Sequence, residues 1–281
     1  MSKPAQKAGG AVRRIRRRVA RWAAPEIDAE LRSAKRRLRS ARAELRGARA
    51  RLAELEHELP AAVEETIGRV RAEHLTYLKP AGLRELAAVV RDAETARLPG
   101  LLIEAGTALG GSAIVMAAAK DPERPFRVYD VFGMIPAPGE EDGADVHARY
   151  ADIAGGRARG VGGATYYGYR DDLLGEVTAS FDRLGVPVEE HHVELIQGLF
   201  ADTLEVDGPV AVAHLDGDWY ESTMTCLTRI APHVVPSGRI VLDDYYQWSG
   251  CRTAVDEYFD GRDDFAFEHR SKLHVVRAPG A

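Results

Sequence analysis

The 281-residue chain is long enough for one α/β domain and an additional segment, and its 45% hydrophobic content is sufficient for a sizeable core. No apolar run approaches the roughly eighteen residues of a membrane-spanning helix, and the arginine-rich N-terminus lacks the apolar core of a signal peptide. The two cysteines, Cys226 and Cys251, form no CxxC motif. We therefore expect a reduced, cytoplasmic protein without a transmembrane segment.

The net charge of −5 is unevenly distributed. Residues 1–60 carry 17 Lys and Arg against 7 Asp and Glu, whereas the remaining chain carries 21 against 36. Residues 1–24 contain the basic run Arg13 to Arg18, which is expected to be either a solvated terminus or a weak contact for a membrane surface. Aromatic and basic residues do not continue to alternate beyond Trp22, so nucleic-acid binding is not expected.

Residues 25–80 form the second predicted region, a helical coiled coil. Between Pro25 and Pro60 a heptad repeat places apolar residues at the a and d positions. If two such helices associate in parallel, three of the four g to e′ residue pairs between them have opposite charges. We therefore expect a homodimer or a higher homo-oligomer. The alternative is one amphipathic helix that packs on its own domain. The a and d residues are Ile27, Leu31, Ala34, Leu38, Ala41, Leu45, Ala48, Leu52, Leu55 and Leu59.

Residues 81–281 alternate between strand-like and helix-like segments, which predicts an α/β domain with a mostly parallel seven-stranded sheet. The interval 134–169 interrupts this alternation with glycines, prolines and tyrosines and is interpreted as a substrate lid. Strands are expected at 101–106, 126–132, within 191–204, and at 209–216, 239–244, 264–268 and 272–277. Helices are expected at 83–98, 113–119, 170–184, 221–230 and 251–260.

The first strand is followed by a glycine-rich turn and a helix, an arrangement typical of nucleotide-type cofactor sites. Glu104, Gly106, Gly110 and Ser112 give the order ExGxxxGxS instead of the GxGxxG of dinucleotide folds. A carboxylate in the turn would repel a pyrophosphate but suits a cationic ligand. Asp130, at the end of the second strand, is suited to accept hydrogen bonds from ribose hydroxyls.

Carboxylates follow two further strands. Asp216 and Asp218 follow the strand at 209–216, and Asp243 and Asp244 follow the strand at 239–244. Ligands collect at the carboxyl ends of parallel strands, and clustered carboxylates need a cation. Oxygen ligands favour Mg²⁺, so we predict a metal site at Asp216, Asp243 and Asp244. Asp218 precedes a helix and is interpreted as a helix cap.

The motifs LDGDWYESTM, VLDDY and GCRTAVDEY resemble those of the macrocin O-methyltransferase family, over roughly residues 98–277. The turn IEAGTALGGSA is similar to the cofactor loop of catechol O-methyltransferases. The resemblance implies a Rossmann-like class I methyltransferase that uses S-adenosylmethionine and Mg²⁺ on a sugar or glycoside hydroxyl. It places Asp216, Asp243 and Asp244 as metal ligands and the following residues around the cofactor: Glu104, Gly106, Gly110, Ser112, Asp130, Gly198 and Phe200.

Three positions depart from these families. Trp219 stands where the catechol enzymes have a lysine base, and the chain has TALGG where the sugar enzymes have VWRGG. His214 replaces an arginine-like residue, and it shares a strand face with Asp216. Asp216 or His214 is therefore the expected base.

The expected acceptor is a sugar or other vicinal diol in natural-product or glycan biosynthesis. The alternatives are a non-catalytic cofactor-binding scaffold assembled through the coiled coil and a metal-dependent hydrolase, which the glycine turn disfavours.

Overall fold

The computed structural model describes residues 59–280. Their sheet has seven strands in the order β3-β2-β1-β4-β5-β7-β6, parallel except for β7, which runs antiparallel to both of its neighbours. The expectation of a mostly parallel seven-stranded sheet is confirmed. The strands are β1 Leu101–Ala105, β2 Phe126–Asp130, β3 Val193–Gln197, β4 Val210–Leu215, β5 Val234–Leu242, β6 Phe265–His269 and β7 Leu273–Arg277.

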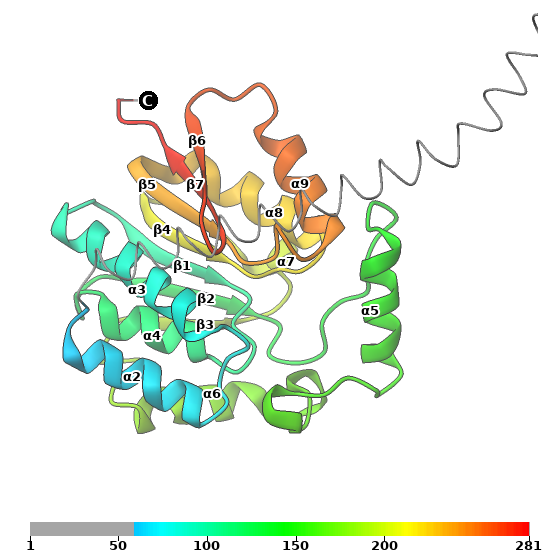
Figure 1. The fold of residues 1–281 in the computed structure, drawn as a ribbon. Helices are drawn as coiled ribbons and strands as arrows, with labels where there is room; N and C mark the ends of the chain where they lie inside the picture. Colours follow the sequence, from blue (N-terminus) through cyan, green and yellow to red (C-terminus); the bar gives the residue numbers. More distant parts are fainter. Residues whose placement is uncertain (1–58, 281) are drawn as a thin grey trace, which may run out of the picture. The chain divides into compact units, whose positions relative to one another are not determined.

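Helices cover both faces of the sheet (Figure 1). Alternate residues of each central strand enter different cores: Leu102 and Val212 pack with α2, α3, α4 and α6, whereas Ile103 and Ala213 pack with the helices on the other face. The helices are α2 Ala61–Ala72, α3 Pro80–Thr95, α4 Gly111–Ala119, α5 Ala144–Ala154, α6 Leu173–Arg183, α7 Phe200–Thr203, α8 Tyr220–Ile230 and α9 Ser249–Phe259, with short 3₁₀ turns at Val161–Gly163, Tyr167–Tyr169 and Ala231–His233. Within residues 59–280 the helices are too short or too polar to cross a membrane.

Residues 25–58 of the predicted coiled-coil region lie outside the described residues. Beyond Pro60 the chain continues as α2, whose Val63, Ile67 and Val70 are buried in the same core as α3 and α4. The α/β domain therefore includes α2 and extends to the N-terminal side of the predicted boundary at residue 81. The sequence pattern did not reveal this, because the spacing of these three residues fits a coiled-coil seam and a domain core equally well.

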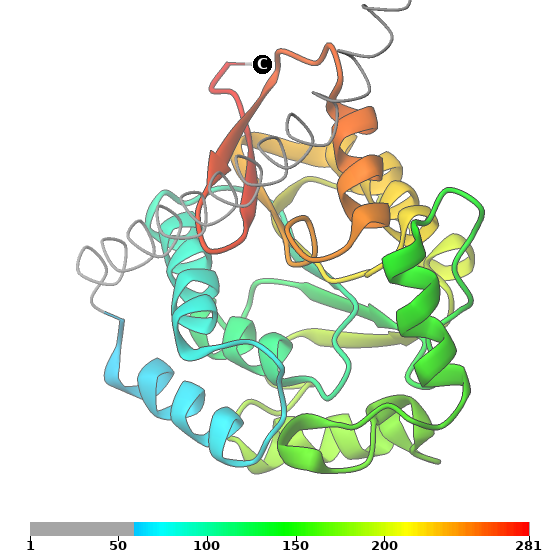
Figure 2. The same cartoon turned by 45° about the vertical axis from the view of Figure 1, so that its right-hand side comes forward.

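Two further segments differ from the prediction. β5 begins at Val234 instead of residue 239, because the chain stays in the sheet through an irregularity in its pairing with β4. The interval 134–169 contains α5, and its Val146 and Ile153 belong to a small hydrophobic core that also includes Trp219. Figure 2 shows α5 beside α9, which it contacts where Asp145 accepts a hydrogen bond from the Ser249 amide.

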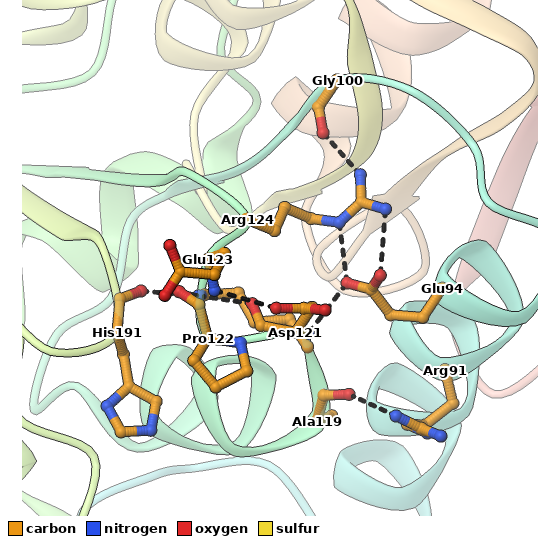
Figure 3. A network of polar contacts seen from close by, with 10 residues as sticks. Arg91, Glu94, Gly100, Ala119, Asp121, Pro122, Glu123, Arg124 and His191 are labelled. Atoms are coloured by element: carbon orange, nitrogen blue, oxygen red, sulfur yellow. Dashed lines mark hydrogen bonds and ion pairs between the residues drawn. The ribbon is translucent and has the colours of Figure 1, made fainter.

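Figure 3 shows a polar network around Arg124 and Glu94. Gly100 and Arg124 precede β1 and β2, so the network lies at the amino ends of these strands, at the opposite edge of the sheet from the acidic strand ends. The Arg124 guanidinium forms two hydrogen bonds with the Glu94 carboxylate, at 2.7 and 3.0 Å, and donates another to the Gly100 carbonyl. Both charged side chains are mostly buried, 11% and 15% exposed. This network fixes α3 and the start of β1 to the loop before β2.

Candidate active site

The acidic strand ends meet where β4 and β5 end side by side. Leu215 is the register partner of Leu242, and the Asp243 amide donates to the Leu215 carbonyl, so Asp216 and Asp243 continue adjacent strands. Three carboxylates, Asp216, Asp218 and Asp244, each present an oxygen within 4.8 Å of the others. We call these three residues the acidic cluster.

Asp218 belongs to this cluster and does not cap α8, so the interpretation of Asp218 as a helix cap is wrong. Its backbone is left-handed, with φ of 57°, and its amide donates to Asp244 Oδ2 at 3.0 Å. Its Oδ1 accepts a hydrogen bond from Trp248 Nε1 at 2.8 Å. Asp142 accepts from the Tyr220 amide at the start of α8 instead, at 2.9 Å.

Burial and mutual repulsion act on the acidic cluster. Burial raises the pKa of Asp216 well above its ordinary value, and the charges of Asp243 and Asp244 raise it further. Burial and then the charge of Asp218 likewise raise the pKa of Asp244, and burial followed by Asp216 raises the pKa of Asp218 to about 8. A hard divalent cation would relieve this repulsion, and the all-oxygen donor set fits Mg²⁺.

Asp243 is in a different environment from the acidic cluster. Burial would raise its pKa, but His214 and Lys272 lower it below the ordinary value. Lys272 Nζ is 2.6 Å from Asp243 Oδ2, and His214 Nε2 is 3.6 Å from Asp243 Oδ1. Asp243 Oδ1 is buried and has no hydrogen-bond partner among residues 59–280, so a cation could bind this oxygen.

His214 lies between two carboxylates in the interior of the sheet. Its Nδ1 is 2.7 Å from Glu104 Oε1, and its side chain is 1% exposed. Burial would lower the pKa of His214, but the carboxylates of Asp243 and Glu104 beside its ring raise it to about 10. The two carboxylates therefore favour the protonated form of His214, and this geometry does not favour the predicted alternative in which it acts as the base.

The glycine turn after β1 is packed against the turn after β4. Gly106 has φ of 89°, and a Cβ atom there would lie 2.0 Å from the Asp216 carbonyl oxygen, so only glycine fits. Asp130 holds the turn from β2: its Oδ2 accepts from the amides of Thr107 and Ala108 at 2.7 and 2.9 Å. The predicted cofactor turn and the acidic strand ends are thus in direct contact.

One cavity joins these two parts. Of the residues predicted from sequence, Gly106, Asp130, Phe200 and Asp216 line it, and Asp218 does so as well. The other predicted cofactor residues mainly support the strands and turns around this cavity. They are Glu104, Gly110, Ser112 and Gly198. Glu104 bonds His214, Gly110 precedes α4 with φ of 83°, Ser112 is buried in the first turn of α4, and the Gly198 amide donates to the Asp130 carbonyl.

Aromatic side chains form the wall of the site near Asp218. Trp219 is buried, lines the cavity and donates from Nε1 to the Pro136 carbonyl at 3.0 Å. Tyr167 also lines the cavity, and its ring centroid is 4.3 Å from that of Tyr166 and 6.3 Å from that of Tyr77. Tyr77, which precedes α3, reaches the site only through its contact with Tyr167, and no local sequence motif marks it.

Comparisons with known proteins agree with this arrangement. The profile of the macrocin O-methyltransferase (TylF) family matches residues 34–264, so the similarity starts well before the predicted residue 98 and includes part of the heptad repeat. One relative is the 8-demethyl-8-(2,3-dimethoxy-alpha-L-rhamnosyl)-tetracenomycin-C 4'-O-methyltransferase of Streptomyces olivaceus. The two sequences are 32% identical over 73% of this chain and 70% of the relative.

A second relative, the demethyldecarbamoylnovobiocin O-methyltransferase of Streptomyces niveus, is 33% identical over 69% of this chain and 72% of its own. The solved structure of the O-methyltransferase NovP superposes with a TM-score of 0.56, at 28% identity, and covers 70% of this chain and 79% of NovP. CalS11, a calicheamicin methyltransferase, shares the fold at 18% identity and a TM-score of 0.53. The chain therefore belongs to the macrocin O-methyltransferase family, whose members are S-adenosylmethionine-dependent O-methyltransferases with a Rossmann-like fold.

Proposed function

We propose that this enzyme transfers a methyl group from S-adenosylmethionine to a hydroxyl of a sugar or other vicinal diol on a natural product or glycan, and that it requires Mg²⁺ or a similar divalent cation. The observation that carries the proposal is the shared cavity: Gly106 from the cofactor turn and Asp130 from the end of β2 line it together with Asp216 and Asp218 from the acidic cluster. The relatives support the acceptor class, because one of them is named for a rhamnosyl compound.

The cation would be held by Asp216, Asp244 and Asp243 Oδ1, which receives no hydrogen bond from residues 59–280. A bound divalent cation lowers the pKa of a coordinated hydroxyl, which supplies a better nucleophile. Asp216 was predicted as the base, but Asp218 is the better candidate. It lines the cavity beside the aromatic wall, and Trp248 fixes only one of its two oxygens.

The other residues of the site position the reactants. Asp130 and Gly106 shape the cofactor turn, and Trp219 and Tyr167 offer flat apolar surfaces to the acceptor. Methyl transfer needs the acceptor oxygen in line with the methyl carbon, so this positioning is the main contribution of the protein.

The test combines binding with turnover. Isothermal titration with S-adenosylhomocysteine should give the same affinity with and without Mg²⁺, and methyl transfer to a panel of rhamnosides and other diol glycosides should stop when EDTA is added. Full turnover in EDTA would refute the metal requirement. Cofactor binding without transfer to any hydroxyl acceptor would favour the scaffold alternative.

We also propose that the insertion 134–169 closes over the acceptor. Its α5 is bound to α9 through Asp145, and Trp219 donates to the Pro136 carbonyl, so the insertion is already attached to the acceptor side of the cavity. Limited proteolysis within 134–169 should slow when acceptor and S-adenosylhomocysteine are both present. Equal cleavage with and without them would argue against closure.

A further inference from the structure

Lys272 is a cation that the fold itself places at the acidic strand ends. It lies in the turn between β6 and β7, directly before Leu273, which is the register partner of Leu242. Asp243 follows Leu242, so the pairing of β5 with β7 brings Lys272 and Asp243 together. Lys272 Nζ is 2.6 Å from Asp243 Oδ2 and also donates to the Asp243 carbonyl oxygen at 3.0 Å.

The two hydrogen bonds to one residue fix the ammonium group at this position. The Lys272 side chain is 23% exposed and that of Asp243 is 13% exposed, so water screens the pair only weakly. Asp243 Oδ1, in contrast, is buried and has no hydrogen-bond partner in the described part of the chain. The same carboxylate thus has Oδ2 bound to the Lys272 ammonium group, whereas Oδ1 lies 3.6 Å from His214 Nε2 without a hydrogen bond to it.

A divalent cation bound to Asp243 Oδ1, Asp216 and Asp244 would share the Asp243 carboxylate with this ammonium group. Two positive charges on the two oxygens of one carboxylate repel each other, and the repulsion is strong where water is scarce. When the cation is absent, Lys272 compensates part of the charge of the acidic strand ends, which contain Asp216, Asp218, Asp243 and Asp244.

We propose that Lys272 is a built-in counter-cation that holds Asp243 in place in the metal-free enzyme and weakens the binding of the divalent cation. Lys272 is a positioning residue, because it acts through Asp243. This inference rests on the metal site of the proposed function, but it concerns the affinity of that site and is tested without turnover.

The experiment measures Mn²⁺ binding to the full-length protein by isothermal titration, without S-adenosylmethionine. Lys272→Met should bind Mn²⁺ about tenfold more tightly than the wild type, because the repelling charge is gone. Lys272→Arg keeps the charge and should bind like the wild type. Arg270→Met is the matched control: it removes a positive charge from the same turn, but Arg270 pairs with Glu268 and not with Asp243, so its effect should be less than about twofold.

A thermal melt adds a readout that does not depend on the titration. Without metal, Lys272→Met should have a lower melting temperature than the wild type, and saturating Mn²⁺ should raise it by more than it raises that of the wild type. Affinity for S-adenosylhomocysteine checks that the variant is folded, and Lys272→Gln replaces Lys272→Met if it is not.

The outcomes separate the two proposals. If the wild type binds Mn²⁺ and Lys272→Met binds it equally or more weakly, the counter-cation role is wrong and the metal site stands. If neither the wild type nor any variant binds Mn²⁺, both the metal site and the counter-cation role are wrong.

Discussion

Glu104 on β1 and His214 on β4 are bonded in the interior of the sheet, with 2.7 Å between Oε1 and Nδ1. The two residues are register partners on adjacent parallel strands, so this contact is a direct result of the strand order. Glu104 was predicted to lie around the cofactor, but one of its oxygens is bonded to His214. The pair connects the cofactor turn after β1 with the acidic strand ends, because His214 also faces Asp243.

Replacement of the acidic cluster should separate turnover from cofactor binding. Asp216→Asn and Asp244→Asn should each reduce kcat by at least about a hundredfold, because an amide cannot neutralise a divalent cation, while the affinity for S-adenosylhomocysteine changes little. Steady-state kinetics and isothermal titration measure the two effects. Asp263→Asn, which changes an exposed carboxylate, is the control. Undiminished turnover in Asp244→Asn would contradict the metal assignment.

Asp218→Asn tests the proposed base. The amide keeps an oxygen that can accept from Trp248 but cannot take a proton, so kcat should fall by about 10²–10⁴ while KM for S-adenosylmethionine stays near the wild-type value. Trp248→Phe removes only the hydrogen bond and should cost far less activity. If Trp248→Phe lost as much kcat as Asp218→Asn, the role of Asp218 would be structural.

The network at the opposite edge of the sheet should affect stability without affecting chemistry. Arg124→Gln leaves the Glu94 carboxylate buried without its partner and should lower the free energy of unfolding by about 3 kcal/mol, measured in urea. Adding Glu94→Gln should recover part of this loss. Arg127→Gln is the exposed control, because its partners Glu194 and Asp207 are 66% and 83% exposed, and it should cost less than about 1 kcal/mol. A large change in kcat for Arg124→Gln would contradict this separation.

His274 should make stability depend on pH. Burial, followed by the charges of Arg239 and Arg270, lowers the pKa of His274 well below its ordinary 6.5 in the folded protein. The unfolded chain therefore takes up the proton first, and the contribution of a neutral His274 is present above pH 6.5 and lost as the pH falls below it.

Between pH 7.5 and 5.5 the wild type should lose about 1.4 kcal/mol of unfolding free energy that His274→Gln does not lose. Urea unfolding of both proteins across this range measures the difference. Glu85, whose Oε1 is 3.5 Å from His274 Nε2, has a pKa that burial raises, and its effect has the opposite sign. The comparison should therefore be repeated in a Glu85→Gln background. Parallel pH curves for the two proteins would rule out this role of His274.

The predicted coiled coil is testable by deletion. Removal of residues 1–58 leaves Pro60 and all of α2, whose buried residues belong to the α/β domain. We expect a lower oligomeric state, because leucines at seven-residue intervals need a partner helix to leave water, and we expect methyl transfer to persist. Light scattering gives the number of protomers per particle. An unchanged number would favour the alternative in which the helix packs on its own domain.

The sequence alone determined the α/β alternation, the glycine turn and the carboxylates at the ends of β4 and β5. These features are local: continuous apolar runs identify buried parallel strands, and strand ends locate the site. The same local rules failed at Asp218, because the residue that caps α8 in its place, Asp142, is 78 positions away along the chain.

Only the tertiary structure decided which charged groups share the site. Asp243 and Lys272 are 29 residues apart and meet because β7 pairs with β5, and Tyr77 meets Tyr167 because α2 and α3 pack on the same face of the sheet as α6. No periodicity or motif encodes such pairs, since a side chain's charged neighbour depends on strand order and register, which long-range packing determines.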